Sequence, residues 1–174
     1  MVILYYADLK YPDVANGIGV RVSLFVSGCR RYCPECFNKE AWDFKYGKPF
    51  TDKEITFIES KLQLPQVRGL SLLGGEPMEL ENVIELWPLC QYLKTHYPDK
   101  DIWCYTGYTF EELWVRENSA IRKLLDYIDI LVDGDYQKDK HDLSLRFRGS
   151  SNQRIIDIKK TFKQRNIVLA EEYM

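Results

Sequence analysis

The sequence lacks the segments that mark secreted, membrane-spanning and repetitive proteins. Its N-terminus, MVILYYADLKYPD, has no basic stretch followed by a long apolar run, which argues against a signal peptide. Its longest apolar stretches are far shorter than the roughly 18 residues that indicate a membrane-spanning helix. No repeat, low-complexity segment or linker rich in proline, glycine and serine divides the 174 residues. We therefore expect one cytoplasmic domain over residues 1–174, with no membrane partner.

An excess of positive charge is also missing. The formal net charge is −2, with 24 lysines and arginines against 26 aspartates and glutamates. A protein that binds nucleic acid through its bulk charge needs a basic surface, so we expect no nucleic-acid partner. The remaining local exception is the small basic cluster RFR at 146–148.

The cysteines do not fit a disulfide framework. There are five, an odd number, in a chain expected to be cytoplasmic. Such cysteines are typically reduced thiols or metal ligands.

Short apolar runs alternate with helical patterns along the chain. Thr51 with Glu54 and Thr109 with Glu112 match capping boxes that begin two of the helices. The predicted strands are 21–26, 69–73, 101–105, 128–132 and 154–158, and the predicted helices are 51–62, 79–95 and 109–126. Pro88 either kinks the second helix or marks its start, and 166–170 is a late strand or a packed tail.

This alternation predicts an α/β fold with a mainly parallel sheet. In such a sheet the loops that follow the strands lie at one edge, where ligands bind. The unusual residues of this sequence fall in those loops: 27–36, 74–77, 106–107 and 133–134. We therefore expect them to form one site.

The strongest chemical signal is a group of three cysteines. Cys29, Cys33 and Cys36 have the spacing C-x3-C-x2-C, which lets three thiolates surround one compact metal centre. Iron–sulfur clusters commonly take four thiolates, so three would leave one iron open to a cofactor or substrate. Backbone amides around residues 33–37 could donate to the cluster sulfurs.

A structural zinc site is the alternative reading of these cysteines. It would need a fourth ligand, and the candidates Cys90, Cys104, His96 and His141 are all distant in sequence. Cys90 falls in a helical pattern and Cys104 in a strand, where a free cysteine is often part of the core.

Four further loops add candidate binding residues. Gly74, Gly75 and Glu76 begin the turn GGEP directly after a strand, where two glycines allow close backbone approach to a ligand. Thr106 and Asp133 end later strands with groups suited to ribose or amino-acid polar atoms. Ordinary turns and helix caps also use these residue types. Residues 146–153, RFRGSSNQ, are dense in hydrogen-bond donors, or else form a solvated loop.

Together these motifs resemble the radical S-adenosylmethionine superfamily. Within it, the chain is similar to the anaerobic ribonucleoside-triphosphate reductase activating proteins. The segments that carry the resemblance are NGIGVRVSLFVSGC at 16–29, CPECFNKEAW at 33–42, LSLLGGEP at 70–77, DIWCYTGYTFEEL at 101–113, ILVDG at 130–134 and LSLRFRGSSNQRIID at 143–157. Two positions depart from the family pattern: Glu35, where this family often has glycine, and GIG at 17–19, where it usually has GPG.

The resemblance implies a partial (β/α) barrel that is open on one side. It implies one 4Fe-4S cluster on the three cysteines and S-adenosylmethionine as the second cofactor. The residues expected to bind the cofactors are Glu35, Cys36, Phe37, Gly74, Gly75, Glu76, Thr106, Asp133 and Arg148.

The resemblance also implies an activity and two partners. A flavodoxin-like protein would supply one electron, S-adenosylmethionine would give a 5′-deoxyadenosyl radical, and that radical would install a glycyl radical on anaerobic ribonucleoside-triphosphate reductase. The cofactors carry this chemistry, so no catalytic acid or base is expected. Two alternatives remain: a radical enzyme that acts on a small molecule, and a zinc-binding adaptor without turnover.

Overall fold

The computed structural model describes residues 3–174 and contains one seven-stranded sheet. The strand order is β3-β1-β2-β4-β5-β6-β7. The strands are β1 (Tyr5–Asp13), β2 (Val20–Val26), β3 (Lys48–Pro49), β4 (Val67–Gly74), β5 (Asp101–Tyr105), β6 (Ile130–Asp133) and β7 (Arg154–Asp157). The four central strands, β2, β4, β5 and β6, are parallel to one another, and β1, β3 and β7 pair antiparallel at the edges.

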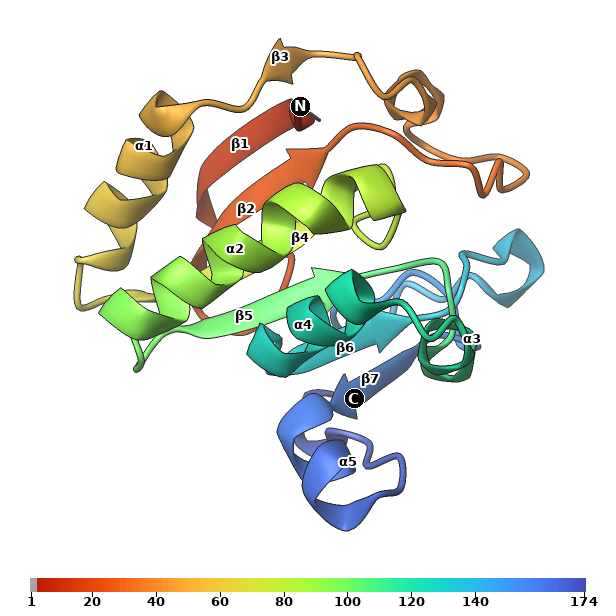
Figure 1. Ribbon diagram of the computed structural model, residues 1–174. Helices are drawn as coiled ribbons and strands as arrows, with labels where there is room; N and C mark the ends of the chain where they lie inside the picture. Colours follow the sequence, from red (N-terminus) through yellow and green to blue (C-terminus); the bar gives the residue numbers. More distant parts are fainter. Residues whose placement is uncertain (1–2) are drawn as a thin grey trace.

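Helices cover one face of this sheet. They are α1 (Asp52–Leu62), α2 (Leu80–His96), α3 (Phe110–Val115), α4 (Ser119–Tyr127) and α5 (Ile158–Gln164). Figure 1 shows α2 and α4 lying side by side in front of the strands, with α1 beside β1 and α5 near the C-terminus. Three short 3-10 helices, Lys39–Trp42, Lys138–Lys140 and Glu171–Tyr173, lie in the connections.

The core lies on both faces of the sheet. On β5, Ile102 and Cys104 pack into the large cluster under the helices, whereas Trp103 belongs to a second cluster. Successive residues of a strand point to opposite faces, so the second cluster covers the other side. There Trp103 contacts Phe147 and Tyr173, whose ring centroids lie 5.4 and 5.2 Å away. Burial on both faces explains why the central strands read as continuous apolar runs.

These observations confirm the predicted α/β class and the largely parallel open sheet, which is consistent with a partial barrel. The strand over 101–105 and the capping boxes of α1 and α3 are as predicted. Helix α2 runs on through Pro88, so this proline neither begins nor ends the helix.

Several predicted boundaries were wrong. The helix expected over 109–126 is two helices, because Glu117 adopts a left-handed backbone (φ 49°) and Asn118 caps a new helix. The strand expected over 128–132 begins at Ile130, and the one expected over 154–158 ends at Asp157, which caps α5. Residues 166–170 form a packed tail with a single bridge from Leu169 to Ile156.

Strands β1 and β3 were not predicted at all. Asp8, Lys10 and Pro12 of β1 are exposed, and β3 is two exposed residues, so neither shows the apolar run of a central strand. None of the helices within residues 3–174 combines the length and the apolar character that crossing a bilayer requires.

Candidate cofactor site

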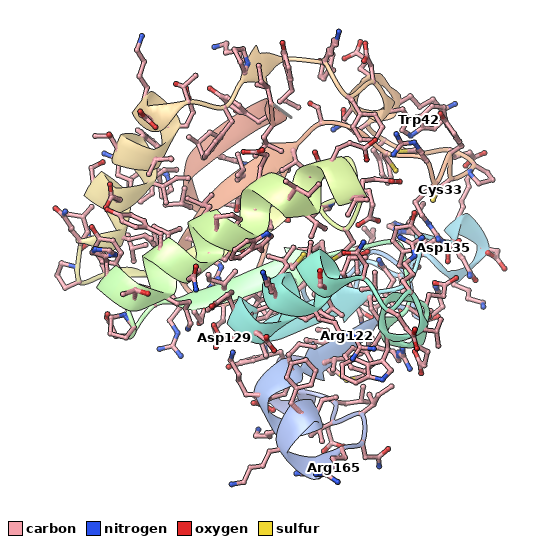
Figure 2. All side chains as sticks on the ribbon, viewed as in Figure 1. Cys33, Trp42, Arg122, Asp129, Asp135 and Arg165 are labelled. Carbon is pink, nitrogen blue, oxygen red and sulfur yellow. The ribbon has the colours of Figure 1, made fainter. Side chains whose placement is uncertain are left out.

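A cavity of about 270 Å³ lies at the carboxyl ends of the parallel strands. Figure 2 shows Cys33 and Trp42, from the segment after β2, near Asp135, from the segment after β6, at this edge of the molecule. Residues at the ends of β2, β4, β5 and β6 line the cavity, together with Gln153 from the segment before β7. The residues at the strand ends are Cys29, Arg31, Cys33, Cys36, Phe37, Asn38 and Trp42; Leu73, Gly74, Gly75 and Glu76; Tyr105, Thr106 and Gly107; and Gly134, Asp135 and Tyr136.

A larger cavity, of about 670 Å³, lies between α3 and α5. It is lined mainly by apolar side chains such as Phe110, Trp114 and Phe162, and it contains none of the cysteines. This cavity is larger than the cysteine cavity, but it lacks the metal-binding thiols. The cysteine cavity is therefore the candidate site.

The cysteine loop starts from a backbone position that only glycine fits well. Gly28 has φ +97°, and a Cβ there would lie 2.2 Å from the ring of Phe44. The N–H of Gly28 donates to the carbonyl of Ala41 (2.8 Å), and that of Cys29 donates to Trp42 (3.2 Å). The loop therefore leaves β2 tied to the segment that follows the third cysteine.

Backbone amides already point at two of the sulfurs. The N–H of Arg31 donates to Sγ of Cys29, and the N–H of Asn38 donates to Sγ of Cys36, both at 3.4 Å. Such donors stabilise negative charge on a thiolate. Hydrogen bonds from backbone amides to the ligand sulfurs are a feature of cluster-binding loops, and Cys29 and Cys36 both receive one.

Burial favours the protonated form of two of the three thiols, Cys29 and Cys33. It raises the pKa of Cys29 to about 11, although the N–H of Arg31 lowers it in part. Burial also raises the pKa of Cys33, against the lowering effect of the Arg31 charge. A bound metal must displace these protons, and thiolates are the ligands of iron–sulfur clusters and of zinc alike.

The three cysteines fit a cluster better than a single ion. Within residues 3–174 no three cysteine, histidine or acidic side chains converge closely enough to hold one metal ion. A four-iron cluster does not need such convergence, because each thiolate binds a different iron. The residues present therefore fit the cluster that the cysteine spacing indicates.

The GGEP turn and the cysteine loop form one hydrogen-bonded unit. The N–H of Gly75 donates to Val26 (2.7 Å), and that of Glu76 donates to Gly28 (2.9 Å). A Cβ at Gly75 would lie 2.7 Å from the carbonyl oxygen of Gly28. Gly75 is thus required for close packing of two protein segments, in addition to any approach by a ligand.

Glu76 joins this unit to the end of β5. Its side chain is 1% exposed. Oε1 accepts from the N–H of Met78 (2.8 Å) and the hydroxyl of Thr106 (2.7 Å), and Oε2 accepts from the N–H of Gly107 (2.8 Å). Burial raises the pKa of Glu76 to about 7, while these hydrogen bonds lower it in part. The carboxyl therefore connects two strand-end loops.

Comparison with known proteins shows the family of the chain. A family model described as "4Fe-4S single cluster domain" matches residues 15–156. The anaerobic ribonucleoside-triphosphate reductase-activating protein of Pasteurella multocida (strain Pm70) is 44% identical over 146 residues, which cover 82% of this chain and 91% of the relative.

Two further relatives carry the same name. That of Escherichia coli (strain K12) is 43% identical, with 82% of this chain and 92% of the relative covered. That of Enterobacteria phage T4 is 39% identical over 149 residues, with 85% and 91% covered. The chain belongs to this family of reductase-activating proteins.

Most of the predicted binding residues of this family member line the cavity. Cys29, Cys33, Cys36, Phe37, Gly74, Gly75, Glu76 and Thr106 all do so. Glu35 does not: its backbone is left-handed (φ 58°), as a glycine at this position would allow, and its carboxylate pairs with Nζ of Lys138 at 2.5 Å. Its assignment as a binding residue stays a prediction.

Asp133 and Arg148 are also outside the cavity lining. Asp133 is 1% exposed, accepts from the N–H of Phe110 (2.8 Å) and pairs with Arg154 (2.5 Å). Arg148 donates from Nη1 to the carbonyl of Gln153 (2.6 Å). Both contacts favour a structural role, and cofactor binding by either residue stays a prediction.

Sequence reasoning missed two kinds of residue at this site. Asn82 donates from Nδ2 to the carbonyls of Ser27 (3.0 Å) and Glu76 (2.9 Å), which joins the first two loops. Nothing in the sequence distinguishes it from other polar residues of a helix. Arg31, Trp42 and Tyr105 line the cavity but were singled out by no motif, although the first two lie in or beside the cysteine motif.

Proposed function

We propose that the chain is the activase of an anaerobic ribonucleoside-triphosphate reductase and uses a 4Fe-4S cluster with S-adenosylmethionine. The observation that carries the proposal is the meeting of the three cysteines and the GGEP turn in one cavity. The partner follows from the names of the relatives, whose alignments cover 82% of this chain and 91–92% of the relatives.

In this proposal Cys29, Cys33 and Cys36 hold the cluster and leave one iron without a protein ligand. Gly74 and Gly75 offer their backbone to the methionine part of S-adenosylmethionine, because neither has a side chain between the strand end and the cavity. Glu76 and Thr106 keep the two loops together rather than contact the cofactor directly, since each is occupied by the other.

The bound cofactors would supply the chemistry, namely reductive cleavage of S-adenosylmethionine to a 5′-deoxyadenosyl radical that takes hydrogen from a glycine of the reductase. The protein supplies position and exclusion of water. The sheet is open, with β3 and β7 at its two edges, which suits a substrate that is a polypeptide segment of another protein. A flavodoxin-like electron donor and a cytoplasmic location are further parts of the proposal.

Anaerobic reconstitution tests the proposal in two steps. The reconstituted protein should contain about four irons per chain and, with a reductant, should convert S-adenosylmethionine to 5′-deoxyadenosine. Adding the reductase should then give a glycyl radical, measured by electron paramagnetic resonance. Absence of 5′-deoxyadenosine would favour a zinc adaptor, and 5′-deoxyadenosine without a glycyl radical would favour a small-molecule substrate.

A further inference from the structure

Three hydrogen-bonding atoms in the wall of the cysteine cavity are buried and have no partner among residues 3–174. They are Nε of Arg31, Nε1 of Trp42 and the hydroxyl of Tyr105. The two nitrogens can only donate, and the hydroxyl can donate as well. A buried donor without an acceptor is unfavourable, because it has lost its hydrogen bonds to water. The wall is therefore suited to a ligand that is rich in acceptors or negatively charged.

Arg31 is the charged member of this set. Its guanidinium lies over the ring of Tyr108, with Cζ 4.5 Å from the centroid, and the Tyr108 hydroxyl is held by Glu79 at 3.3 Å. The carboxylate paired with Arg31 is that of Asp135, at the long distance of 3.9 Å, and Asp135 is substantially exposed. An ion pair of this kind neutralises little of the charge.

Gly107 leaves room beside this guanidinium. A Cβ at Gly107 would lie 3.0 Å from Nε of Arg31 and 3.4 Å from Oε2 of Glu76. Glu76 forms no ion pair with Arg31; its oxygens accept instead from Met78, Thr106 and Gly107. The positive charge of Arg31 therefore remains available to a ligand in the cavity.

The neighbouring arginine provides a contrast. Arg30 directs its guanidinium to two carboxylates, with Nη1 2.9 Å from Glu79 and Nη2 2.5 Å from Glu81. Its charge is thus neutralised by protein groups, and it is not part of the cavity wall. The two arginines are adjacent in the cysteine loop, but Arg30 is paired with two nearby carboxylates, whereas Arg31 has one distant and exposed carboxylate.

We propose that Arg31 is the residue that compensates the negative charge of the iron–sulfur cluster and makes the cluster easier to reduce. The inference rests on the proposed function. Three thiolates give a 4Fe-4S cluster a net negative charge, and the electron that reduces it adds another. A cation in the wall stabilises the reduced cluster more than the oxidised one, so it raises the reduction potential.

The test is a redox titration of anaerobically reconstituted protein without S-adenosylmethionine, with dithionite as the one-electron reductant and electron paramagnetic resonance as the readout. Arg31→Gln should lower the midpoint potential at unchanged iron and sulfide content. Arg31→Lys, which keeps the charge, should restore most of the shift. Arg30→Gln is the matched control and should shift the potential less than Arg31→Gln does.

Each outcome bears on the inference. A wild-type potential in Arg31→Gln with full iron content would overturn the inference. If the affinity of this variant for S-adenosylmethionine fell at the same time, Arg31 would instead bind the carboxylate of the cofactor. If Arg31→Gln cannot hold a cluster, retention in Arg31→Lys supports the need for charge, and loss in both variants contradicts it. A wild-type chain that takes up no cluster would instead refute the proposed function.

Discussion

Replacing Glu76 by glutamine should change how the stability of the cluster-free protein depends on pH. Burial raises the pKa of this carboxyl from its ordinary value of 4.5 to about 7. Well below pH 4.5 the group is protonated in the folded and the unfolded chain, so its ionisation has no effect on stability. As pH rises, the unfolded chain ionises first, and the folded state loses stability until the folded group ionises as well.

The magnitude follows from the two pKa values. An increase from 4.5 to about 7, at about 1.4 kcal/mol per pKa unit, corresponds to a full loss of about 3 kcal/mol. The loss is about 1 kcal/mol near pH 5 and about 3 kcal/mol near pH 8. Glutamine cannot ionise, so the stability of Glu76→Gln relative to wild type should rise by about 2 kcal/mol over this range.

A constant term accompanies this pH-dependent one. The carboxyl accepts hydrogen bonds on both oxygens, and a glutamine amide places N–H groups against either Gly107 or Thr106 with Met78. The lost acceptor costs about 1–3 kcal/mol at every pH. The stability difference between Glu76→Gln and wild type at one pH therefore does not test the reasoning. The change in that difference between two pH values does.

Urea unfolding of the cluster-free protein, under anaerobic reducing conditions near pH 5 and near pH 8, measures this change. Glu112→Gln is the control. The pKa of Glu112 is lowered, chiefly by the N–H of Thr109, so this group is largely ionised in both states from pH 5 to pH 8. Its difference from wild type should stay constant. If the Glu76→Gln difference is equally constant, the reasoning about this buried carboxyl is refuted.

Three further predictions concern the cysteine loop, the GGEP turn and Arg148. Replacing any one of the three loop cysteines by alanine should remove most of the visible absorbance of the cluster and the cleavage of S-adenosylmethionine, whereas Cys90→Ala should keep the cluster, since Cys90 is buried under the helices; loss of the cluster in Cys90→Ala would contradict the three-ligand assignment. Gly75→Ala should lower both thermal stability and cluster content, because its Cβ would lie 2.7 Å from the carbonyl oxygen of Gly28, and wild-type behaviour would show that the loops adjust freely. Arg148→Ala should lower thermal stability by releasing the carbonyl of Gln153, and a loss of glycyl-radical yield alone, with normal stability and 5′-deoxyadenosine formation, would assign Arg148 to docking instead.

The strands that form the site were predictable because they are buried on both faces. Such strands are short apolar runs, and each ends at a polar or glycine-containing turn that breaks the pattern. The predicted convergence of the turns after 26, 73, 105 and 132 follows from parallel pairing alone. The edge strands β1 and β3 were missed because an exposed strand has no apolar run to detect.

The individual side chains of the site were less predictable than its location. Thr106 and Asp133 both lie at strand ends and both carry side-chain oxygen atoms, so from the sequence both are equally good candidates for cofactor binding. The structure separates them: Thr106 lines the cavity, whereas Asp133 is directed to the N-terminus of α3 and to Arg154. Contacts between elements decide this difference, and a single sequence does not contain them.

Glu76 illustrates how the loops work as a unit. A glutamate in a cofactor-binding turn invites the interpretation that its carboxylate binds the cofactor, yet all its hydrogen bonds within residues 3–174 are to Met78, Thr106 and Gly107. The neighbouring amides of Gly75 and Glu76 bond to the chain on either side of the cysteine loop's start. Movement of one strand-end loop must therefore move the others. A cluster that is held by one loop and meets a cofactor held by another needs this coupling, because the distance between them is set by the hydrogen bonds that join the loops.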